Sequence, residues 1–392
     1  MAAQEAAVAV IKSALLLTAT LLLPTAVLSA VLPEDRADVI YHSYDGDGTA
    51  VDGPAVLVRK NVSGNVSLWG RYYQDVVSGA SIDVRAAATS FTETRNEYSL
   101  GADYLYDKTT LSAGFTNSDS GDYLSDSYSF AVSHDFFGDL TTVALSFGFS
   151  DEDVFDVTDE SFADEVTTQS YTFSLSQILT KNIVVGLTAQ SISSEGFLNS
   201  PYRDVRFLDP GNVAGFNFED ELYPRTRNSD AVAIRYNQYL PYRASIRGEY
   251  RAYADSWGIE SNTFRFDYIH PFENLTLSLN LRYYDQNTPA DFYSDLFAFS
   301  EATNFRARDK ELSTYSILSL GVGASYELPE TWLPFLDKSS VSLFIDRLNY
   351  DYSDFRDVTV TEEGGLPLFA PGEEPLFGFD ATVVRFFVSF WY

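Results

Sequence analysis

The chain has 392 residues, with 26 Lys and Arg against 56 Asp and Glu, so its formal net charge is −30 at pH 7. A charge of that size and sign repels a polyanion, which excludes a nucleic-acid-binding protein. The absence of cysteine excludes disulfides, thiolate metal sites and cysteine nucleophiles. Aromatic residues make up 15% of the chain, which suits a long β-surface with aromatic bands better than an ordinary soluble core.

The first thirty residues have the order of a secretory signal peptide. Lys12 precedes an apolar run at 14–23, and the small residues Ser29 and Ala30 follow it. A basic residue, a short apolar stretch and small residues form the n-region, h-region and cleavage site of an export signal, and the run is too short to span a bilayer comfortably. We predict a cleaved signal over residues 1–30 and a single domain over 31–392.

The remainder of the chain alternates apolar and polar residues with a period of two. Between residues 97 and 107, Tyr98, Leu100 and Tyr104 share one face, while Ser99 and its neighbours at the same spacing form the other. This period is that of a β-strand with one apolar side. The hairpin is the repeating unit, and its strands run about 10–14 residues, longer than the roughly 5–6 of soluble sheets and suited to a tilted membrane crossing.

The connections between these strands alternate in length. Short turns on one side and long segments on the other are typical of an outer-membrane barrel, whose short turns face the periplasm. The sequence therefore predicts an all-β, transmembrane, antiparallel up-and-down β-barrel. The short turns lie near 63–65, 107–108, 138–139, 180–182, 240–242 and 271–274, and the long segments are 78–94, 151–167, 195–228, 287–311 and 353–378.

Counting strands by their turns gives fifteen between Ala55 and Tyr392. An additional strand over 37–44 makes the number even and returns both ends of the barrel to the periplasm. We therefore expect about 16 strands, with 14 as the alternative. Closure of the barrel leaves no unpaired sheet edge in lipid.

The last residues of the chain end on an aromatic side chain with apolar residues at every second position behind it. This pattern resembles the signal by which barrel-assembly machinery recognises its outer-membrane clients. We expect the machinery to be a partner during biogenesis and outer-membrane lipid to surround the folded barrel. The residues of the predicted assembly signal are Val384, Phe386, Val388, Phe390 and Tyr392.

The polar face of the central strands carries charged residues, and we expect it to line the interior. Two hypotheses remain open for this mixed wall. It is either a pore lining whose fixed charges select solutes, or a salt-bridged filling that stabilises a closed barrel. The predicted lumen residues are Arg247, Glu249, Arg251, Arg265, Asp267 and Arg282.

Two further segments stand out between the strands. The long segment 196–228 contains both arginines and carboxylates, and it is either a constriction folded into the lumen or an external flap. Residues 151–165 (DEDVFDVTDESFADE) carry eight carboxylates and no basic residue, which predicts a solvated acidic loop.

No cofactor is expected, although two acidic motifs have oxygen-ligand and glycine spacing that is weakly indicative of calcium. The first consists of Asp45, Asp47 and Asp52, and the second runs over 117–122 (NSDSGD). Neither completes a full calcium loop that ends in glutamate, so ordinary solvated acidic loops remain the alternative.

Catalysis finds little support in the three histidines. His134 lies at a short turn, away from the outer face, and His42 is adjacent to Ser43, so the two side chains of that pair point to opposite faces of a strand. We therefore do not expect an enzyme.

Several stretches, densest before residue 150, resemble a family of Gram-negative outer-membrane proteins described only as a domain of unknown function. The resemblance implies export and a barrel in the outer membrane, and it brings no substrate or catalytic residue with it. The stretches are 42–46 (HSYDG), 53–60 (GPAVLVRK), 72–83 (YYQDVVSGASID), 116–119 (TNSD) with 122–123 (DY), and 137–142 (FGDLTT).

The sequence thus supports two functions. The first is an outer-membrane channel or transporter-like pore for hydrophilic solutes with a lumen of arginines and carboxylates. The alternative is a non-conducting scaffold that presents acidic loops outside or docks a periplasmic partner at its short turns. A continuous water path favours the channel, and a plugged lumen favours the scaffold.

Overall fold

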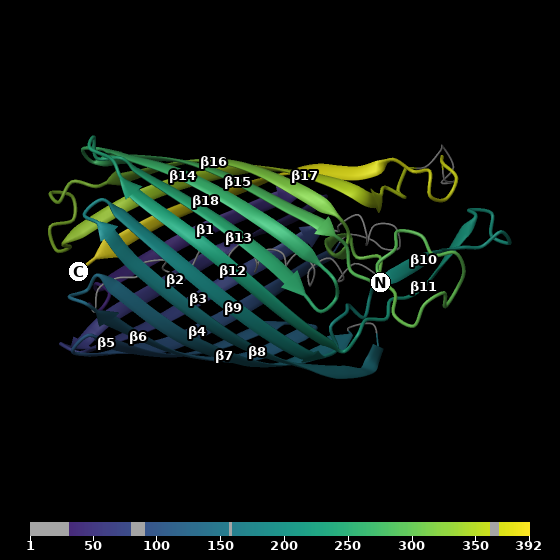
Figure 1. Ribbon diagram of the computed structural model, residues 1–392, viewed down its shortest axis with the longest axis horizontal. Helices are drawn as coiled ribbons and strands as arrows, with labels where there is room; N and C mark the ends of the chain where they lie inside the picture. The colour runs from purple at the N-terminus through teal and green to yellow at the C-terminus, as the bar shows by residue number, and fades with distance from the viewer. Residues whose placement is uncertain (1–30, 80–90, 157–158, 361–367) are drawn as a thin grey trace.

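The computed structural model describes residues 31–79, 91–156, 159–360 and 368–392. The predicted signal peptide, residues 1–30, lies outside the described residues. Sixteen strands form one closed antiparallel barrel in which each strand pairs with the next barrel strand along the chain, β9 with β12 across the intervening hairpin, and β18 pairs with β1 to complete the ring (Figure 1). The prediction of 16 strands is confirmed and the alternative of 14 is wrong.

The barrel strands are long, and most are connected by a tight turn at the end that holds the C-terminus. Two further strands, β10 and β11, form a separate hairpin in the long segment after β9. The barrel strands are β1 Arg36–Gly46, β2 Thr49–Ser63, β3 Val66–Gly79, β4 Phe91–Tyr106, β5 Thr109–Ser120, β6 Tyr123–Phe136, β7 Thr141–Asp156, β8 Asp159–Thr180, β9 Ile183–Gly196, β12 Thr226–Tyr239, β13 Ser245–Asp255, β14 Glu260–Phe272, β15 Leu275–Thr288, β16 Tyr315–Glu327, β17 Lys338–Arg356 and β18 Leu376–Trp391; the hairpin is β10 Asp204–Leu208 with β11 Phe216–Asp220.

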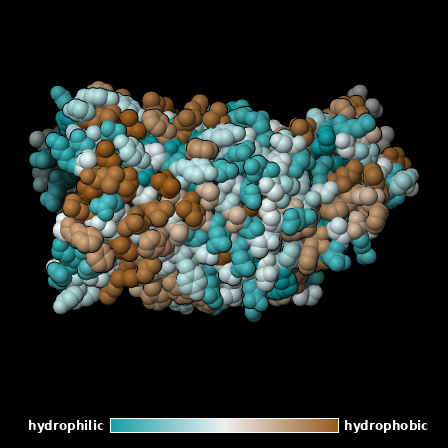
Figure 2. All heavy atoms as spheres, in the orientation of Figure 1, coloured by the Kyte–Doolittle hydropathy of each residue, from teal (hydrophilic) through white to brown (hydrophobic). Residues whose placement is uncertain are grey.

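The outer face of the barrel is apolar. Every second residue of each strand points away from the lumen, and along the lower part of the strands these residues are mostly apolar. On β4, Tyr98, Leu100 and Tyr104 are exposed on this face, while Ser99 and Asp103 between them are buried. In Figure 2 apolar residues gather on the half of the barrel toward the C-terminal end, and polar residues dominate between this band and the outer loops. Exposed apolar side chains arranged as a band around a closed barrel are typical of a surface that faces lipid.

The strands continue beyond this apolar band. On β17 the exposed residues change from Leu343 and Ile345 to Arg347, which forms an ion pair of 2.8 Å with Asp380 of β18 on the outer surface. Charged pairs on the outer face belong in water or at the level of lipid headgroups, so they mark the upper border of the band.

Residues 151–165, predicted to form a solvated loop, are mostly strand. Asp151 to Asp156 end β7 and Asp159 to Glu165 begin β8, and the two strands pair above the membrane band with Asp151 opposite Thr167 and Asp153 opposite Glu165. The predicted loop is therefore wrong. Above the membrane both faces of a hairpin meet water, so its sequence lacks the apolar alternation that identifies a strand.

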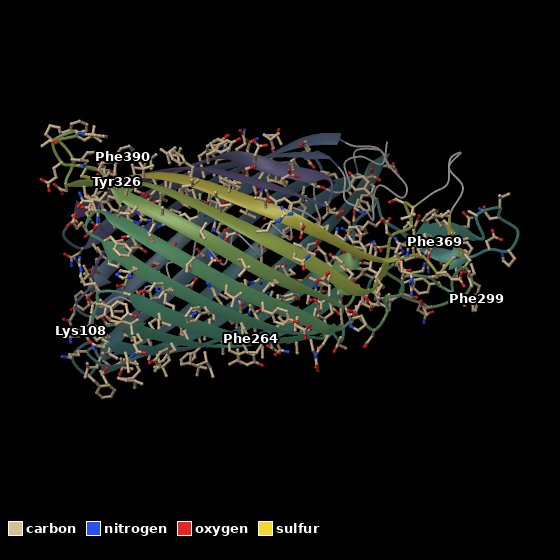
Figure 3. All side chains as sticks on the ribbon, turned by 90° about the horizontal axis from the view of Figure 1, so that it is seen from above. Lys108, Phe264, Phe299, Tyr326, Phe369 and Phe390 are labelled. Atoms are coloured by element: carbon tan, nitrogen blue, oxygen red, sulfur yellow. The ribbon has the colours of Figure 1, made fainter. Side chains whose placement is uncertain are left out.

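The C-terminal strand has the face that its sequence predicts. Phe386 is exposed on the outer face of β18, while Arg385 points inward and forms an ion pair with Asp346 of β17. Phe390 of this strand lies at the same end of the molecule as Lys108 and Tyr326, and Phe299 and Phe369 lie at the other end (Figure 3). Recognition of this strand by assembly machinery stays a prediction.

Among the described residues there is no helix long and apolar enough to cross a membrane.

Candidate functional site

All six predicted lumen residues lie on the inner face of three adjacent strands. Tyr250 and Phe264, which alternate with them, are exposed on the outer face. The register places Glu249 of β13 opposite Arg265 of β14, and Arg265 opposite Arg282 of β15. One step along, Arg247 is opposite Asp267. The structure therefore brings together the residues that the sequence selected by their period alone.

Arg235 of β12 lies on the same inner face, next to these residues, and the sequence analysis missed it. Its guanidinium donates to the Glu249 carboxylate, and it lies opposite Glu249 in the register. The alternation of Ala231, Ala233 and Arg235 with the exposed Val232 and Ile234 could have identified it. Arg235 extends the charged rows across four strands.

We call this set the arginine wall: Arg235, Arg247, Glu249, Arg251, Arg265, Asp267 and Arg282.

The ion pairs of the arginine wall are half exposed. The Nε of Arg265 lies 3.0 Å from a carboxylate oxygen of Asp267, yet its side chain keeps 38% of its surface exposed. Arg251 donates to the amide oxygen of Gln190 at 3.2 Å, and Arg247 is exposed. Five arginines meet only two carboxylates, so the wall carries excess positive charge in a protein whose net charge is −30.

A polar row continues from the arginine wall around the barrel. Asn280 of β15 donates to Asp346 of β17 at 3.0 Å across the intervening strand β16. This contact requires Gly321 on β16, since a Cβ there would lie 1.9 Å from the Asp346 carboxylate. Asp346 also pairs with Arg385, so charged and amide groups extend from β12 to β18.

A second charged wall on β1 to β4 was not predicted. His42 stacks on Tyr73 with ring centroids 4.8 Å apart, and its Nε2 lies 2.7 Å from Asp75, which also pairs with Arg95 at 3.1 Å. Arg71 pairs with Glu97 on the same wall. The period-two spacing of Arg71, Tyr73 and Asp75 carried this signal, but the sequence analysis selected charged residues only in the middle of the chain. Basic and acidic groups balance here, in contrast to the arginine wall.

The long segments at the other end fold together into a compact body above the barrel. It includes the β10–β11 hairpin, the short helix η1 (Lys310–Leu312) and the segment at 368–375, and we call it the outer cap. Its parts pair through the backbone: Leu208 donates to Phe297, and Leu222 and Arg306 donate to each other, at 2.8–2.9 Å. Tyr223, Trp257 and Leu312 pack into its apolar cluster.

Buried arginines connect the segments of the outer cap. Arg206 has no exposed surface, forms an ion pair with Asp295 at 2.9 Å and donates to Glu374. Arg308 pairs with the same Asp295 at 2.9 Å. Arg206 reaches Glu374 on a distant segment, and Arg308 also donates to the backbone carbonyl of Arg356, so the cap is a folded unit rather than a set of independent loops.

Burial in the cap raises the pKa of two of its acidic groups. Burial raises the pKa of Glu221 to about 7, with Asp309 adding to the shift and Arg203 opposing it. On the hairpin, burial raises the pKa of Asp204, and Asp220, its partner across the two strands, adds to the shift.

The contacts of the cap extend from one part of the barrel rim to another. Tyr202 bonds to Asp122, which lies in the turn between β5 and β6. The next residue, Arg203, pairs with Asp309 inside the cap. Lys310 lies 3.5 Å from Asp47, which lies in the turn between β1 and β2. The predicted long segment 196–228 thus forms part of an external cap, and its hairpin projects beyond the barrel (Figure 1). Of the two alternatives, the structure shows the external flap and not a constriction inside the lumen.

The residues of the first calcium motif are not brought together. Asp47 lies near Lys310, and Asp52 accepts a hydrogen bond from Tyr41 at 2.6 Å on the outer face. Across the described ranges no group of three or more histidines and carboxylates is placed to hold a metal ion. Calcium at Asp45, Asp47 and Asp52 stays an untested prediction without support from the geometry.

The histidines have structural partners. His134 lies 2.8 Å from the hydroxyl of Thr109, and His270 stacks on Phe272 with ring centroids 4.1 Å apart. His42 lies in the second charged wall, where its Nε2 contacts Asp75 and Tyr73.

A closed barrel of sixteen strands with an apolar outer band, charged inner walls and a folded outer cap defines a β-barrel of the outer-membrane type. The chain belongs to the family described as "Protein of unknown function (DUF3570)", whose model matches residues 84–163 and 153–333, more than half of the chain. This confirms the family suspected from the sequence, a domain of unknown function. A comparison with curated proteins gives no match.

The chain is also similar to several solved structures at low sequence identity. A bacterial polysaccharide outer membrane secretin is 8% identical with a TM-score of 0.47, covering 92% of this chain and 100% of its own. The siderophore receptor PirA from Pseudomonas aeruginosa is 11% identical with a TM-score of 0.42, covering 92% and 63%. A Pseudomonas aeruginosa FadL homologue is 10% identical with a TM-score of 0.40, covering 93% and 91%.

Proposed function

We propose that the barrel is an outer-membrane channel for hydrophilic solutes, and that the solutes it favours are anionic. The observation that carries this proposal is the arginine wall, in which five arginines share two carboxylates on the inner face of β12 to β15. A ring or ladder of arginines in a pore attracts anions and raises their local concentration.

The half-exposed state of the wall supports conduction rather than mere stabilisation. A salt-bridged filling of a closed barrel would match each arginine with a carboxylate, because an unpaired buried charge is costly. Arg247 is exposed and Arg265 is 38% exposed, so water reaches these guanidinium groups. Their charges are therefore available to a passing solute.

The alternative is a non-conducting scaffold, and two observations favour it. The outer cap contacts the barrel rim at both the β5–β6 turn and the β1–β2 turn. At the opposite end, Trp332 and Phe335 are 68% and 76% exposed between β16 and β17, which suits the docking of a periplasmic partner. In this second proposal the cap closes the barrel and the partner binds these two aromatic side chains.

Single-channel recording of the refolded full chain in a planar bilayer tests the first proposal. The protein should give discrete conductance steps with a reversal potential that indicates anion selectivity. Arg247→Ala and Arg265→Ala should shift that potential toward cations. Arg347→Ala is the matched control, because it removes the same charge from the outer surface.

The contrary results are as clear. A folded, heat-modifiable barrel that never conducts contradicts the channel and favours the scaffold. Steps whose selectivity changes equally in Arg247→Ala and Arg347→Ala show that the arginine wall does not line the path.

A further inference from the structure

Two acidic side chains are buried against each other at the outer rim. Glu93 lies at the outer end of β4 and is 8% exposed, and Asp122 lies in the tight turn between β5 and β6 and is 2% exposed. Their carboxyl groups are in direct contact, and Glu93 also faces Gly121 of the same turn. Both groups lie above the apolar band, whose border on β4 is at Tyr98.

The Glu93 carboxylate and one oxygen of the Asp122 carboxylate lack hydrogen-bond donors. Neither Oε1 nor Oε2 of Glu93 has a hydrogen-bond partner, and Oδ2 of Asp122 has none either. The other oxygen of Asp122 accepts a hydrogen bond from the Ser120 hydroxyl, and the Asp122 carboxylate is also bonded by Tyr202 and by a backbone N–H. The arginine two residues along β4, Arg95, pairs with Asp75 at 3.1 Å.

Two like charges in contact and out of water are unstable unless a proton or a cation neutralises them. The other side chains that bond to the pair also present oxygens, the Ser120 hydroxyl and the Tyr202 hydroxyl. A cavity of about 10 Å³, lined by Asp122 and Asn199 among others, adjoins the Asp122 side of the pair and has room for about one water molecule. Carboxylate, hydroxyl and water oxygens are hard donors that suit Ca²⁺, which accepts irregular shells of 6–8 oxygens.

We propose that Glu93 and Asp122 bind a calcium-type divalent cation at the outer rim, with water completing its shell. Asp122 belongs to the acidic motif 117–122, and the fold supplies Glu93 from another strand. The site also reaches the outer cap, because Tyr202 bonds to Asp122. A bound cation therefore fastens the cap segment at 197–203 to the rim. This inference does not depend on whether the barrel conducts.

Calcium titration of the folded full chain in detergent micelles, followed by calorimetry, tests the site. The affinity should fall by at least about tenfold in Glu93→Gln and in Asp122→Asn, as loss of a ligand costs no less than loss of an outer-shell partner. Asp119→Asn is the matched control, because it removes an exposed carboxylate from the same motif. The control should bind like the wild type.

A second measurement follows the cap in the unaltered chain. Calcium should slow protease cleavage at 197–203 relative to EDTA, and this protection should be lost in both variants while heat-modifiability shows that the barrel stays folded. Equal calcium affinity in all four proteins overturns the proposal, since the binding then comes from other carboxylates. Cleavage of the wild type that is the same in calcium and in EDTA also overturns it and leaves a shared proton as the neutralising group.

Discussion

The arginine wall and the outer cap use the same residue types in opposite ways. In the cap, Arg206 is fully buried and contacts two carboxylates on different segments. In the wall, Arg265 is 38% exposed and its partner Asp267 lies on the same strand. A buried charge that loses its partner is costly, whereas a half-exposed pair contributes little because water screens it. The cap arginines thus serve folding, and the wall arginines are free to serve selection.

The largest expected effect is on the cap. Arg206→Met leaves Glu374 buried without a cationic partner and Asp295 with Arg308 alone, which should destabilise the cap by about 3–5 kcal/mol. Limited proteolysis should show faster cleavage at 209–215, with the barrel still heat-modifiable. An Arg206→Met protein as resistant as the wild type would mean that the buried pairs do not hold the cap together.

A pH titration of the same unit should give the next largest effect. The pKa of Glu221 is about 7 in the folded chain and that of an exposed glutamate is near 4.5, so the folded state retains a proton that the unfolded state has lost. This contribution to stability is complete below about pH 4.5 and is lost as the pH rises through 7. Proteolysis of the cap should accelerate over that range.

Glu221→Gln provides the control for this titration, because a neutral amide does not titrate. Cleavage of this variant should vary less between pH 5 and pH 8 than cleavage of the wild type. An identical pH profile in the two proteins would assign the effect to another group.

Substitution of an arginine in the wall should change ion selectivity and hardly change stability. Arg265→Ala removes a half-exposed pair, so its effect on stability should stay below about 1 kcal/mol, while the reversal potential moves toward cations. Thermal unfolding followed by gel shift measures the first quantity and bilayer recording the second. A large loss of stability without a change in selectivity would mean that the wall arginines, like those of the cap, serve folding.

The smallest effect is expected at an exposed pair of the cap. Arg225 forms an ion pair of 2.6 Å with Asp164 and is 59% exposed. Arg225→Ala should change stability by about 0–1 kcal/mol, and less at high salt. Limited proteolysis of Arg225→Ala and Arg206→Met under the same conditions compares the two losses of stability. Equal losses in the two variants would mean that exposure does not decide the strength of these ion pairs.

The sequence predicted those parts of the structure that a local period encodes. Lipid on one side and the lumen on the other impose opposite polarity on successive residues, so Tyr98 and Ser99, or Phe264 and Arg265, identify a strand and both of its faces without any neighbour. The strand number, the C-terminal strand and the six predicted lumen residues follow from that period. Arg235 carried the same signal and was missed only because it stands between uncharged residues.

Only the tertiary structure decided what happens above the membrane. Water wets both faces of the strands there, so the acidic hairpin at Asp151 and Asp164 shows no alternation and reads as a loop. Arg206 and Glu374 are 168 residues apart, and Glu93 meets Asp122 from another strand. No local pattern records such contacts, because burial that depends on distant segments leaves no period in the sequence.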